Sequence, residues 1–346
     1  MFERPLTIVV TGTVEDRLNT NAAIRAYVAR GLRDLGSHAV VVKEIGCEAL
    51  ASLRGADRVT ADLVLAVGGV AVDASNLRSL RRFADRAGAV LAFWLHDDPY
   101  EFDYAFRLCG VADIVFSTDR WAAMHYGDVP AAHLPLAACP HTHLRPVDRS
   151  VPRDLALFFC GYAYQNRIDF LREGAPVLRR HRTAVSGDQW PQDLPFARNE
   201  RLSPSAFAET AARALLTLNL GRDLSIANAR YNLAPSTPGP RTFEVALMGS
   251  AQLFVAESLE VLDYFERDRE IILIDGARDL EHWLERARDE PDALLAVAAR
   301  AQERALDEHT YARRAETLLG ELRLLGLLPR RAAAPEAMPP LAIAAE

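Results

Sequence analysis

The chain of 346 residues and 38.2 kDa is longer than one hydrophobic core usually serves, which predicts two domains. Half of the residues are hydrophobic and a quarter are charged, as in soluble globular proteins, and the formal net charge of −7 argues against a general nucleic-acid-binding protein. Lys43 is the only lysine, so a phosphate site would have to be built from arginines and backbone amides.

The cysteines and the first residues predict the cellular location. The four cysteines are widely spaced, without a CxxC pair or a metal-ligand pattern, which predicts free thiols in a reducing compartment. The sequence begins MFERPLTIVV, which enters an apolar strand without a signal-peptide pattern, and no apolar run approaches the ~20 residues that span a bilayer. We therefore expect a cytoplasmic protein without a transmembrane segment.

The first half alternates apolar strands with helical segments. Leu6–Val10 is continuously apolar, which is typical of a parallel strand covered on both faces. A helix with Ile24 and Leu32 on one stripe follows and ends at Gly36. This alternation predicts right-handed crossovers and a doubly wound sheet, with ligands at the carboxyl ends of the strands. The remaining strands of this half are predicted at Ala39–Val42, Leu63–Val67, Val90–Leu95 and Ile114–Ser117.

The most informative strand end is WLHDDPY, which directly follows the fourth predicted strand. His96, Asp97 and Asp98 would lie where the sheet opens into a cleft, and they are candidates for a general base or for orienting sugar hydroxyls. A helix N-cap followed by Pro99 would explain one carboxylate but not the whole group. No third ligand is identifiable, so we do not expect a metal site here.

The second half repeats the pattern after a proline-marked linker. Prolines at 140, 146 and 152 mark the linker, in which His141 and His143 are expected to be solvated. Gly161 and Arg167, at the end of the next strand and in the following helical turn, suit a phosphate, although an arginine on an exposed helix face would give the same pattern. Strands are predicted at Leu155–Phe159, Thr183–Val185, Leu215–Leu220, Leu253–Ala256 and Glu270–Ile274, and helices from Asp279 to Leu325.

A short helix is predicted between the turn Pro235–Pro240 and Gly249. Phe243 falls on its apolar face, while Arg241 and Glu244, three residues apart, project together from another. The free N–H groups and the guanidinium can meet a diphosphate, and the carboxylate can accept hydrogen bonds from ribose hydroxyls. A surface ion pair worth ~0.2–0.5 kcal/mol is an equally open interpretation of Arg241 and Glu244.

Six short stretches, spread over about two thirds of the chain, carry a resemblance to a known family. They are WLHDDPYEFDY, HLPLAACP, FFCGYAYQNR, LNLGRD, PGPRTFEVALMGSAQLF and DEHTYARRAETLL. In their order and spacing they resemble the CgeB-type (spore maturation protein) glycosyltransferase family of the GT-B superfamily. Each stretch alone is weak evidence, and their combination carries the resemblance.

The resemblance implies an α/β protein of GT-B architecture, with two Rossmann-like domains facing an interdomain cleft. We expect an acceptor-side domain at 1–145, a nucleotide-sugar donor domain with returning C-terminal helices at 146–330, and a disordered tail at 331–346. The implied activity is that of a hexosyl- or related transferase. Its donor would be a UDP-, GDP- or dTDP-sugar, and it would require neither a metal nor a cofactor. The acceptor and the oligomeric state are not implied.

The resemblance also implies roles for single residues. Glu244 matches the glutamate that binds the donor's ribose, and the helix start at Pro240 would face the diphosphate. Asp98, Asp97 and His96 form the implied catalytic group on the acceptor side. The implied donor nucleotide-binding set is Glu244, Arg241, Phe243, Arg222, Arg167, Gly161 and Pro240.

One departure from the pattern leaves the reaction open. Retaining GT-B enzymes often have a second glutamate eight positions before the ribose-binding one, and here that position is Ser236. If the reaction inverts the sugar, Asp98 or Asp97 is the candidate base; if it retains, they and His96 position the acceptor and the sugar. A nucleotide-sugar epimerase and a non-catalytic nucleotide-sugar-binding paralogue remain alternatives.

Overall fold

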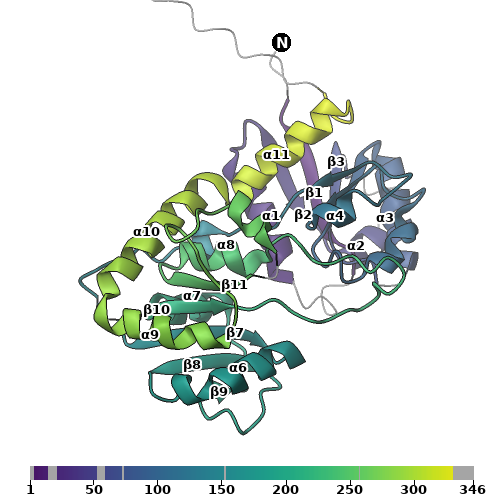
Figure 1. Ribbon diagram of the computed structural model, residues 1–346. Helices are drawn as coiled ribbons and strands as arrows, with labels where there is room; N and C mark the ends of the chain where they lie inside the picture. The colour runs from purple at the N-terminus through teal and green to yellow at the C-terminus, as the bar shows by residue number, and fades with distance from the viewer. Residues whose placement is uncertain are drawn as a thin grey trace, which may run out of the picture.

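Two wholly parallel six-stranded sheets organise the molecule (Figure 1). The structure, a computed structural model, describes residues 4–14, 22–52, 59–71, 74–151, 153–256 and 258–329. The strand orders are β2-β1-β3-β4-β5-β6 and β12-β11-β10-β7-β8-β9. The predicted tail at 331–346 and Pro152 of the linker lie outside the described residues.

The first sheet is covered on both faces because its central strands, β3 and β4, are almost continuously apolar and buried. Ile8 and Leu65 point toward α1 (Ala22–Asp34). Val9 and Val64 point to the opposite face, toward α2 (Cys47–Ser52) and α3 (Ala74–Ala87). The strands are β1 (Leu6–Gly12), β2 (Val40–Glu44), β3 (Leu63–Gly68), β4 (Val90–Leu95), β5 (Ile114–Ser117) and β6 (Ala131–His133).

Five of these six strands were predicted, and β6 was not. β6 has three residues, all of them partly exposed, at the edge of the sheet. A segment this short shows no periodicity, so only its pairing with β5 defines it as a strand.

The second sheet is also enclosed by helices. On one face, α6 (Gln165–Leu178) and α9 (Leu280–Asp289) contribute to the core around Leu157 and Leu216. On the other, α7 (Pro204–Ala212) and α8 (Pro240–Leu247) pack over Phe158. Helix α10 (Pro291–Glu308) packs against α8 and β11. The strands are β7 (Leu155–Tyr162), β8 (Thr183–Asp188), β9 (Ala197–Arg198), β10 (Ala214–Asn219), β11 (Ala251–Val255) and β12 (Ile272–Ile274).

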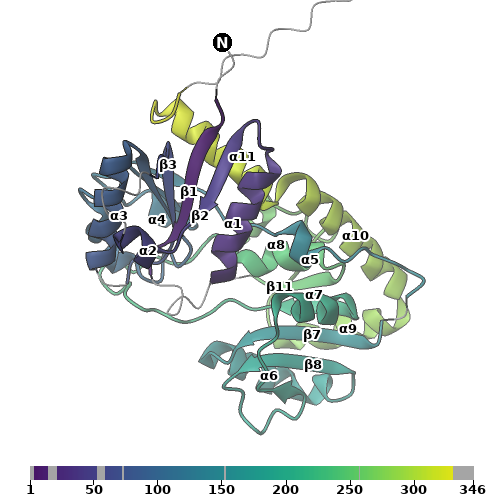
Figure 2. The same cartoon turned by 180° about the vertical axis from the view of Figure 1, so that it is seen from behind.

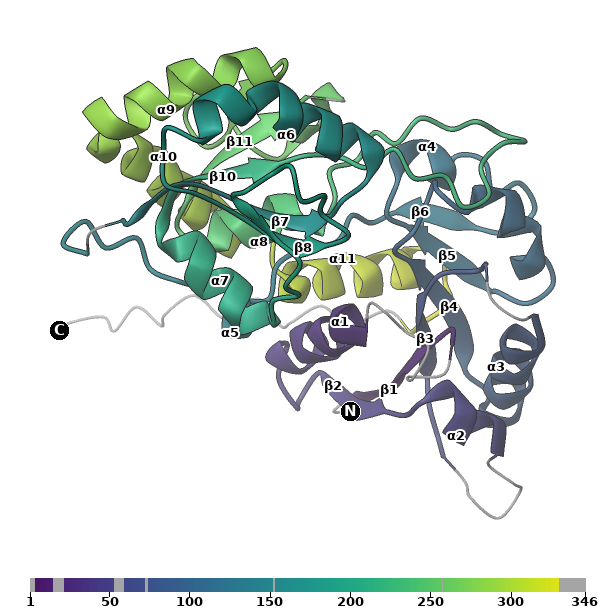
Figure 3. The same cartoon turned by 90° about the horizontal axis from the view of Figure 1, so that it is seen from below.

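The last described helix, α11 (Tyr311–Leu324), returns to the first sheet. Figures 2 and 3 show α11 beside α1 over that sheet. Tyr311 and Leu318 belong to the same core as Ile8. The chain passes between the two halves twice, once before β7 and once before α11, and we call these segments the two chain crossings. They are hydrogen-bonded to each other, since Ala138 donates to the carbonyl of His309 and accepts from the amide of Tyr311.

A segment of the second half, the strap (222–238), crosses to the first half between β10 and α8 (Figure 3). The amide of Ala227 donates to the carbonyl of Tyr100 at 2.8 Å, and the ring of Tyr231 meets that of Phe102 edge-on, with centroids 5.1 Å apart. The strap therefore joins the second half to the segment that follows β4. Within the described residues, no helix combines the length and hydrophobicity needed to cross a membrane.

Candidate active site

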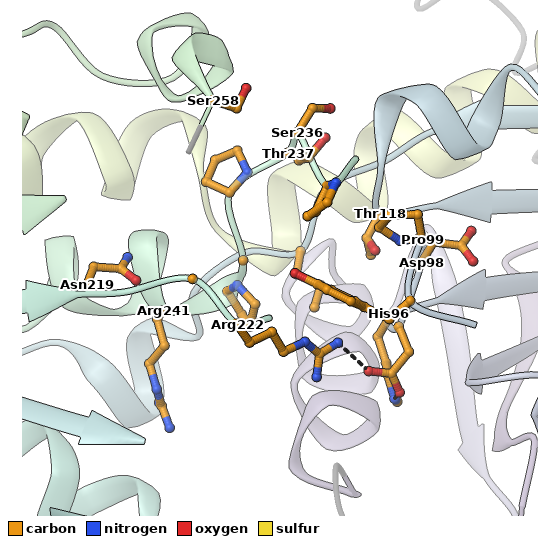
Figure 4. A pocket seen from close by; sticks show the side chains of 18 of the residues that line it. His96, Asp98, Pro99, Thr118, Asn219, Arg222, Ser236, Thr237, Arg241 and Ser258 are labelled. Carbon is orange, nitrogen blue, oxygen red and sulfur yellow. Dashed lines mark hydrogen bonds and ion pairs between the residues drawn. The ribbon is translucent and has the colours of Figure 1, made fainter. Parts of the chain in front are cut away.

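A cavity of about 240 Å³ lies between the two halves, where strand ends of both sheets face each other (Figure 4). The first half contributes the residues after β4 and β5, and the second half contributes the ends of β10 and β11 and the starts of α6 and α8. The polar side chains that line it include His96, Asp97, Thr118, Arg167, Asn219, Arg222, Ser236, Thr237, Arg241 and Ser258.

Asp97 bridges the two halves. Its Oδ2 lies 3.0 Å from Nε2 of His96, and its Oδ1 accepts a hydrogen bond of 2.9 Å from Nη2 of Arg222 (Figure 4). The guanidinium of Arg222 also lies over the ring of Tyr100, 3.9 Å from its centroid. Burial alone would raise the pKa of Asp97, but His96 and Arg222 together hold that pKa well below its usual range. This carboxylate is therefore ionised and has a partner on each oxygen.

Asp98 has a different environment from its neighbour. Its Oδ2 accepts hydrogen bonds from the hydroxyls of Ser117, at 2.6 Å, and Tyr126, at 2.7 Å, while Oδ1 has no hydrogen-bond partner among the described residues. Although Asp98 borders the cavity, its carboxylate points toward the first sheet and away from Arg222 (Figure 4). Burial raises the pKa of Asp98 to about 7, although both hydroxyls lower it.

Arg167 supports the second half's wall of the cavity by donating to backbone carbonyls. Its Nε and Nη2 donate to the carbonyls of Gly221 and Leu220 at 2.8 and 2.9 Å, and its Nη1 donates to that of Tyr162 at 3.1 Å. Burial, together with the charges of Arg222 and Arg241, lowers the pKa of Arg167 to about 10. An anion in the cavity would relieve the repulsion among these three guanidinium groups.

Helix α8 presents an uncapped N-terminus to the same cavity. Its N-cap, Gly239, has no side chain to accept from the helix amides, and Pro240 follows at the first helical position. Thr242 anchors the helix, because its hydroxyl accepts from the side-chain amide of Asn219 at 2.9 Å. Its backbone carbonyl accepts from the side-chain amide of Gln252 at 3.1 Å. The positive end of a firmly held helix thus adds to the charge of the arginines.

Glu244 and Arg241 form an ion pair, but only Arg241 lines the cavity. Nη1 of Arg241 lies 2.6 Å from Oε2 of Glu244, whose side chain is 7% exposed while that of Arg241 is 47% exposed. The structure therefore places Glu244 behind Arg241, not at the cavity wall.

Besides Glu244, two further residues of the predicted donor set lie outside the cavity lining. The ring of Phe243 is completely buried against Phe265 and His309, so it has no surface to offer a nucleotide. Gly161 lies behind Arg167, and a Cβ built there would be 2.9 Å from the guanidinium. The remaining predicted residues that border the cavity are His96, Asp97, Asp98, Arg167, Arg222, Pro240 and Arg241.

The sequence interpretation missed a polar network at the other end of the cavity. Ser236 and Thr237 donate through their hydroxyls to the carboxylate of Glu260, both at 2.8 Å. The amides of the same two residues donate to Oδ2 of Asp119, at 2.9 and 3.4 Å. Glu260 thus brings a carboxylate to Ser236, the position where the expected glutamate is missing. No local pattern could have revealed this, because Asp119 and Glu260 are far from Ser236 in sequence.

The linker contradicts one expectation. Residues Pro140–His143 form the short helix α5, and His143 is 1% exposed instead of solvated. His141 is exposed, with its Nε2 3.2 Å from Oδ2 of Asp34. A proline-rich composition predicted a solvated linker, but the crossing packs against α1, α7 and α8 and buries one of its two histidines.

Comparisons with known proteins find a matching family model and several similar folds. A family model described as glycosyl transferase-like matches residues 166–320. HepE of Anabaena, solved with UDP and glucose, is 11% identical with a TM-score of 0.59, over 92% of this chain and all of that one. Sucrose-phosphate synthase of Thermosynechococcus elongatus is 10% identical with a TM-score of 0.60, over 94% of this chain and 99% of that one. The sequence matches no curated protein.

A third structure is similar to the same extent. A protein of Listeria monocytogenes described as a UDP-N-acetylglucosamine 2-epimerase is 12% identical with a TM-score of 0.56, over 93% of this chain and 97% of that one. At these identities the structures establish the fold, and they confirm the predicted GT-B architecture of two Rossmann-like domains. Among the described residues, no group of three or more side chains could hold a metal ion.

Proposed function

We propose that this protein transfers a sugar from a nucleotide-diphosphate sugar to an acceptor hydroxyl or amine. The observation that carries the proposal is that Arg167, Arg222 and Arg241 are all among the residues that line an interdomain cavity at the uncapped start of α8. The glycosyl transferase-like match over 166–320 and the similarity to a UDP-bound structure support it. We also propose that the enzyme is cytoplasmic and belongs with the CgeB-type glycosyltransferases.

The donor's diphosphate would lie beside the three arginines and the N-terminus of α8. In the transfer, the bond from the anomeric carbon of the sugar to the diphosphate breaks with its electron pair on the leaving phosphate oxygen. The guanidinium groups and the helix amides stabilise that developing charge, so we propose that a bound metal is not required.

Glu244 would bind the donor mainly through Arg241. The family resemblance assigns this glutamate to the ribose, but its carboxylate is buried and bonded to Arg241. The geometry favours a role in which Glu244 fixes the guanidinium that faces the diphosphate. Direct contact with the ribose would require the carboxylate to turn past Arg241.

The acceptor side would supply the proton acceptor. The acceptor oxygen or nitrogen bonds to the anomeric carbon and loses its proton to a base. Asp97 faces the cavity and is paired with Arg222. If Arg222 pairs with a bound diphosphate instead, one oxygen of Asp97 becomes available to accept the proton. Asp98 has a pKa of about 7, which suits proton transfer, but its carboxylate is turned toward Ser117 and Tyr126. In a retaining reaction, His96 and Asp97 would instead position the acceptor.

A thermal-shift screen against UDP, GDP, dTDP and their sugars tests the proposal. We expect one nucleotide and its sugar to raise the melting temperature, because a ligand that binds only the folded state stabilises it by mass action. If no nucleoside diphosphate shifts the melting temperature or binds in calorimetry, the proposed function is wrong.

Glu244→Ala should weaken binding of that nucleotide about tenfold, equivalent to ~1.4 kcal/mol, because Arg241 loses the partner that fixes it. Isothermal titration calorimetry measures the effect. The matched control is Glu209→Ala, which removes an exposed carboxylate from α7, outside the residues that line the cavity, and should leave affinity unchanged. An unchanged affinity in Glu244→Ala would count against the donor-site assignment.

A nucleotide-sugar epimerase is the second candidate, favoured by the similarity to the Listeria structure. An epimerase would convert the donor sugar to its isomer without an acceptor, and NMR of the products separates the two reactions. A non-catalytic paralogue would bind the nucleotide without turnover. Slow hydrolysis of the donor that disappears in Asp98→Asn would exclude that alternative.

A further inference from the structure

A buried histidine of the interdomain linker stands directly behind the proposed donor site. His143 ends helix α5, and its Nε2 lies 3.8 Å from Oε1 of Glu244. Both side chains are almost completely inaccessible to solvent, with 1% and 7% of their surface exposed. A polar contact in such an environment is screened little by water, so it acts more strongly than the same contact at a surface.

The hydrogen bonds of His143 fix the atom that it presents to Glu244. The backbone amide of Cys139 donates to Nδ1 at 3.1 Å, so Nδ1 carries no proton. Burial lowers the pKa of His143, which keeps the ring neutral with its proton on Nε2. The ring of Tyr27 meets that of His143 edge-on at 5.0 Å and holds its plane. The N–H of a neutral imidazole therefore faces the carboxylate.

Glu244 lies between this histidine and the cavity. Its other oxygen, Oε2, is 2.6 Å from Nη1 of Arg241. The guanidinium of Arg241 stacks over the ring of Phe207, 4.0 Å from its centroid, and Arg241 is one of the residues that line the cavity. The three side chains thus form a row from the linker to the proposed donor site, with Glu244 in contact with both of the others.

We propose that His143 is a positioning residue for the donor. It holds Glu244, and Glu244 holds Arg241 in place for the diphosphate of a nucleotide sugar. The inference rests on the proposed function and adds a residue of the linker to it. Because α5 belongs to one of the two chain crossings, a movement of the two halves also moves His143 relative to Glu244 and so changes how firmly Arg241 is held.

Two isosteric variants separate this role from a purely structural one. His143→Asn places an amide oxygen near the position of Nδ1, so it keeps the hydrogen bond from Cys139 but does not reach Glu244. His143→Gln places an amide N–H near the position of Nε2, so it keeps the contact with Glu244 and loses that with Cys139. His141→Ala, an exposed change in the same helix, is the control.

The nucleoside diphosphate that binds the wild-type protein, chosen among UDP, GDP and dTDP, is the probe in calorimetry. We expect His143→Asn to weaken its binding roughly three- to tenfold, and His143→Gln and His141→Ala to stay within about twofold of the wild type. In a Glu244→Ala background, His143→Asn should have no further effect, because the residue through which it acts is gone.

Each other outcome overturns the inference. A purely structural histidine would make His143→Gln the weaker binder, because it loses the linker hydrogen bond, or would give the same loss with and without Glu244. If one of the two His143 variants fails to fold, the affinity of the other variant is compared with the value expected for it above. If the wild type binds no nucleotide, the proposed function fails and takes the inference with it; if the wild type binds and His143→Asn binds equally well, only the inference fails.

Discussion

Adjacent residues in this chain have opposite electrostatic environments. Asp97 and Asp98 lie in the turn that follows β4, where Asp97 faces Arg222 of the second half and Asp98 faces Ser117 and Tyr126 of the first half. The first carboxylate gains a cation and has a lowered pKa, whereas burial and the charges of nearby carboxylates raise the pKa of the second to about 7. One carboxylate is therefore always charged at neutral pH, and the other titrates there.

The stability of the protein should depend on pH through Asp98. Because its folded pKa of about 7 lies above the ordinary value of 3.8, the folded state binds more protons than the unfolded state between these values. The contribution of Asp98 to the free energy of unfolding is therefore largest at low pH and falls as pH rises toward 7. In urea titrations, Asp98→Asn should gain on the order of 2 kcal/mol relative to the wild type between pH 5 and 8.

The exposed variant Asp128→Asn is the control for this titration. It should follow the wild-type pH dependence throughout. Parallel curves for Asp98→Asn and the wild type would show that Asp98 does not titrate in this range.

Among the helices, the contact between α1 and α11 decides how the last described helix packs on the first domain. Gly31 of α1 lies so close to Tyr311 that an added Cβ would stand 2.4 Å from the backbone carbonyl carbon of that residue. Neither backbone can yield without moving a helix. Glycine is therefore required here for close approach, and its φ is not among the positive values found at other glycines.

Gly31→Ala should destabilise the protein by about 1–3 kcal/mol, because it forces α11 away from the core around Leu318 and Ile8. A melting temperature lowered by several degrees is the expected result in calorimetry. Gly320→Ala, within α11, meets no atom within 4 Å and should be neutral or stabilising by up to ~1 kcal/mol. Equal melting temperatures for the two variants would contradict this account of the contact between α1 and α11.

At the scale of the whole molecule, polar contacts across the cavity hold the two halves together. Asp119 of the first half is 2% exposed, and it accepts from the amide of Ala122 at 2.9 Å as well as from the amides of Ser236 and Thr237. Arg120 beside it pairs with Asp263 of the second half at 2.6 Å. The buried part of this network removes donors from water and is expected to matter more than the exposed pair.

Asp119→Ala should therefore lower the free energy of unfolding by about 2–4 kcal/mol, because it leaves the buried amide of Ala122 and the partly buried amides of Ser236 and Thr237 without this acceptor. It should also broaden or divide the unfolding transition as the halves lose their coupling, which differential scanning calorimetry would record. Asp263→Ala, which removes only the exposed pair, should cost about 0–1 kcal/mol. A single sharp transition at the wild-type temperature in Asp119→Ala would contradict the coupling.

The sequence predicted local features because they are encoded locally. The apolar runs Val90–Leu95 and Ile114–Ser117 have the bounds of β4 and β5, and Pro240 and Gly249 bracket α8 as expected. The position of His96 and Asp97 at a strand end also followed from the strand alone, since the carboxyl end of a parallel strand opens onto the ligand side.

The tertiary structure decided which of these side chains meet. Asp97 with Arg222, Glu260 with Ser236, and His143 with Glu244 are pairs formed across chain crossings, and no spacing rule joins residues so far apart. The sequence by itself determined the two domains, their strands and a set of charged candidates, because periodicity and turn chemistry act over a few residues. Burial and pairing depend on how the two sheets face each other, and they made Phe243 a core residue, Glu244 a partner of Arg241, and His143 a buried neighbour of Glu244.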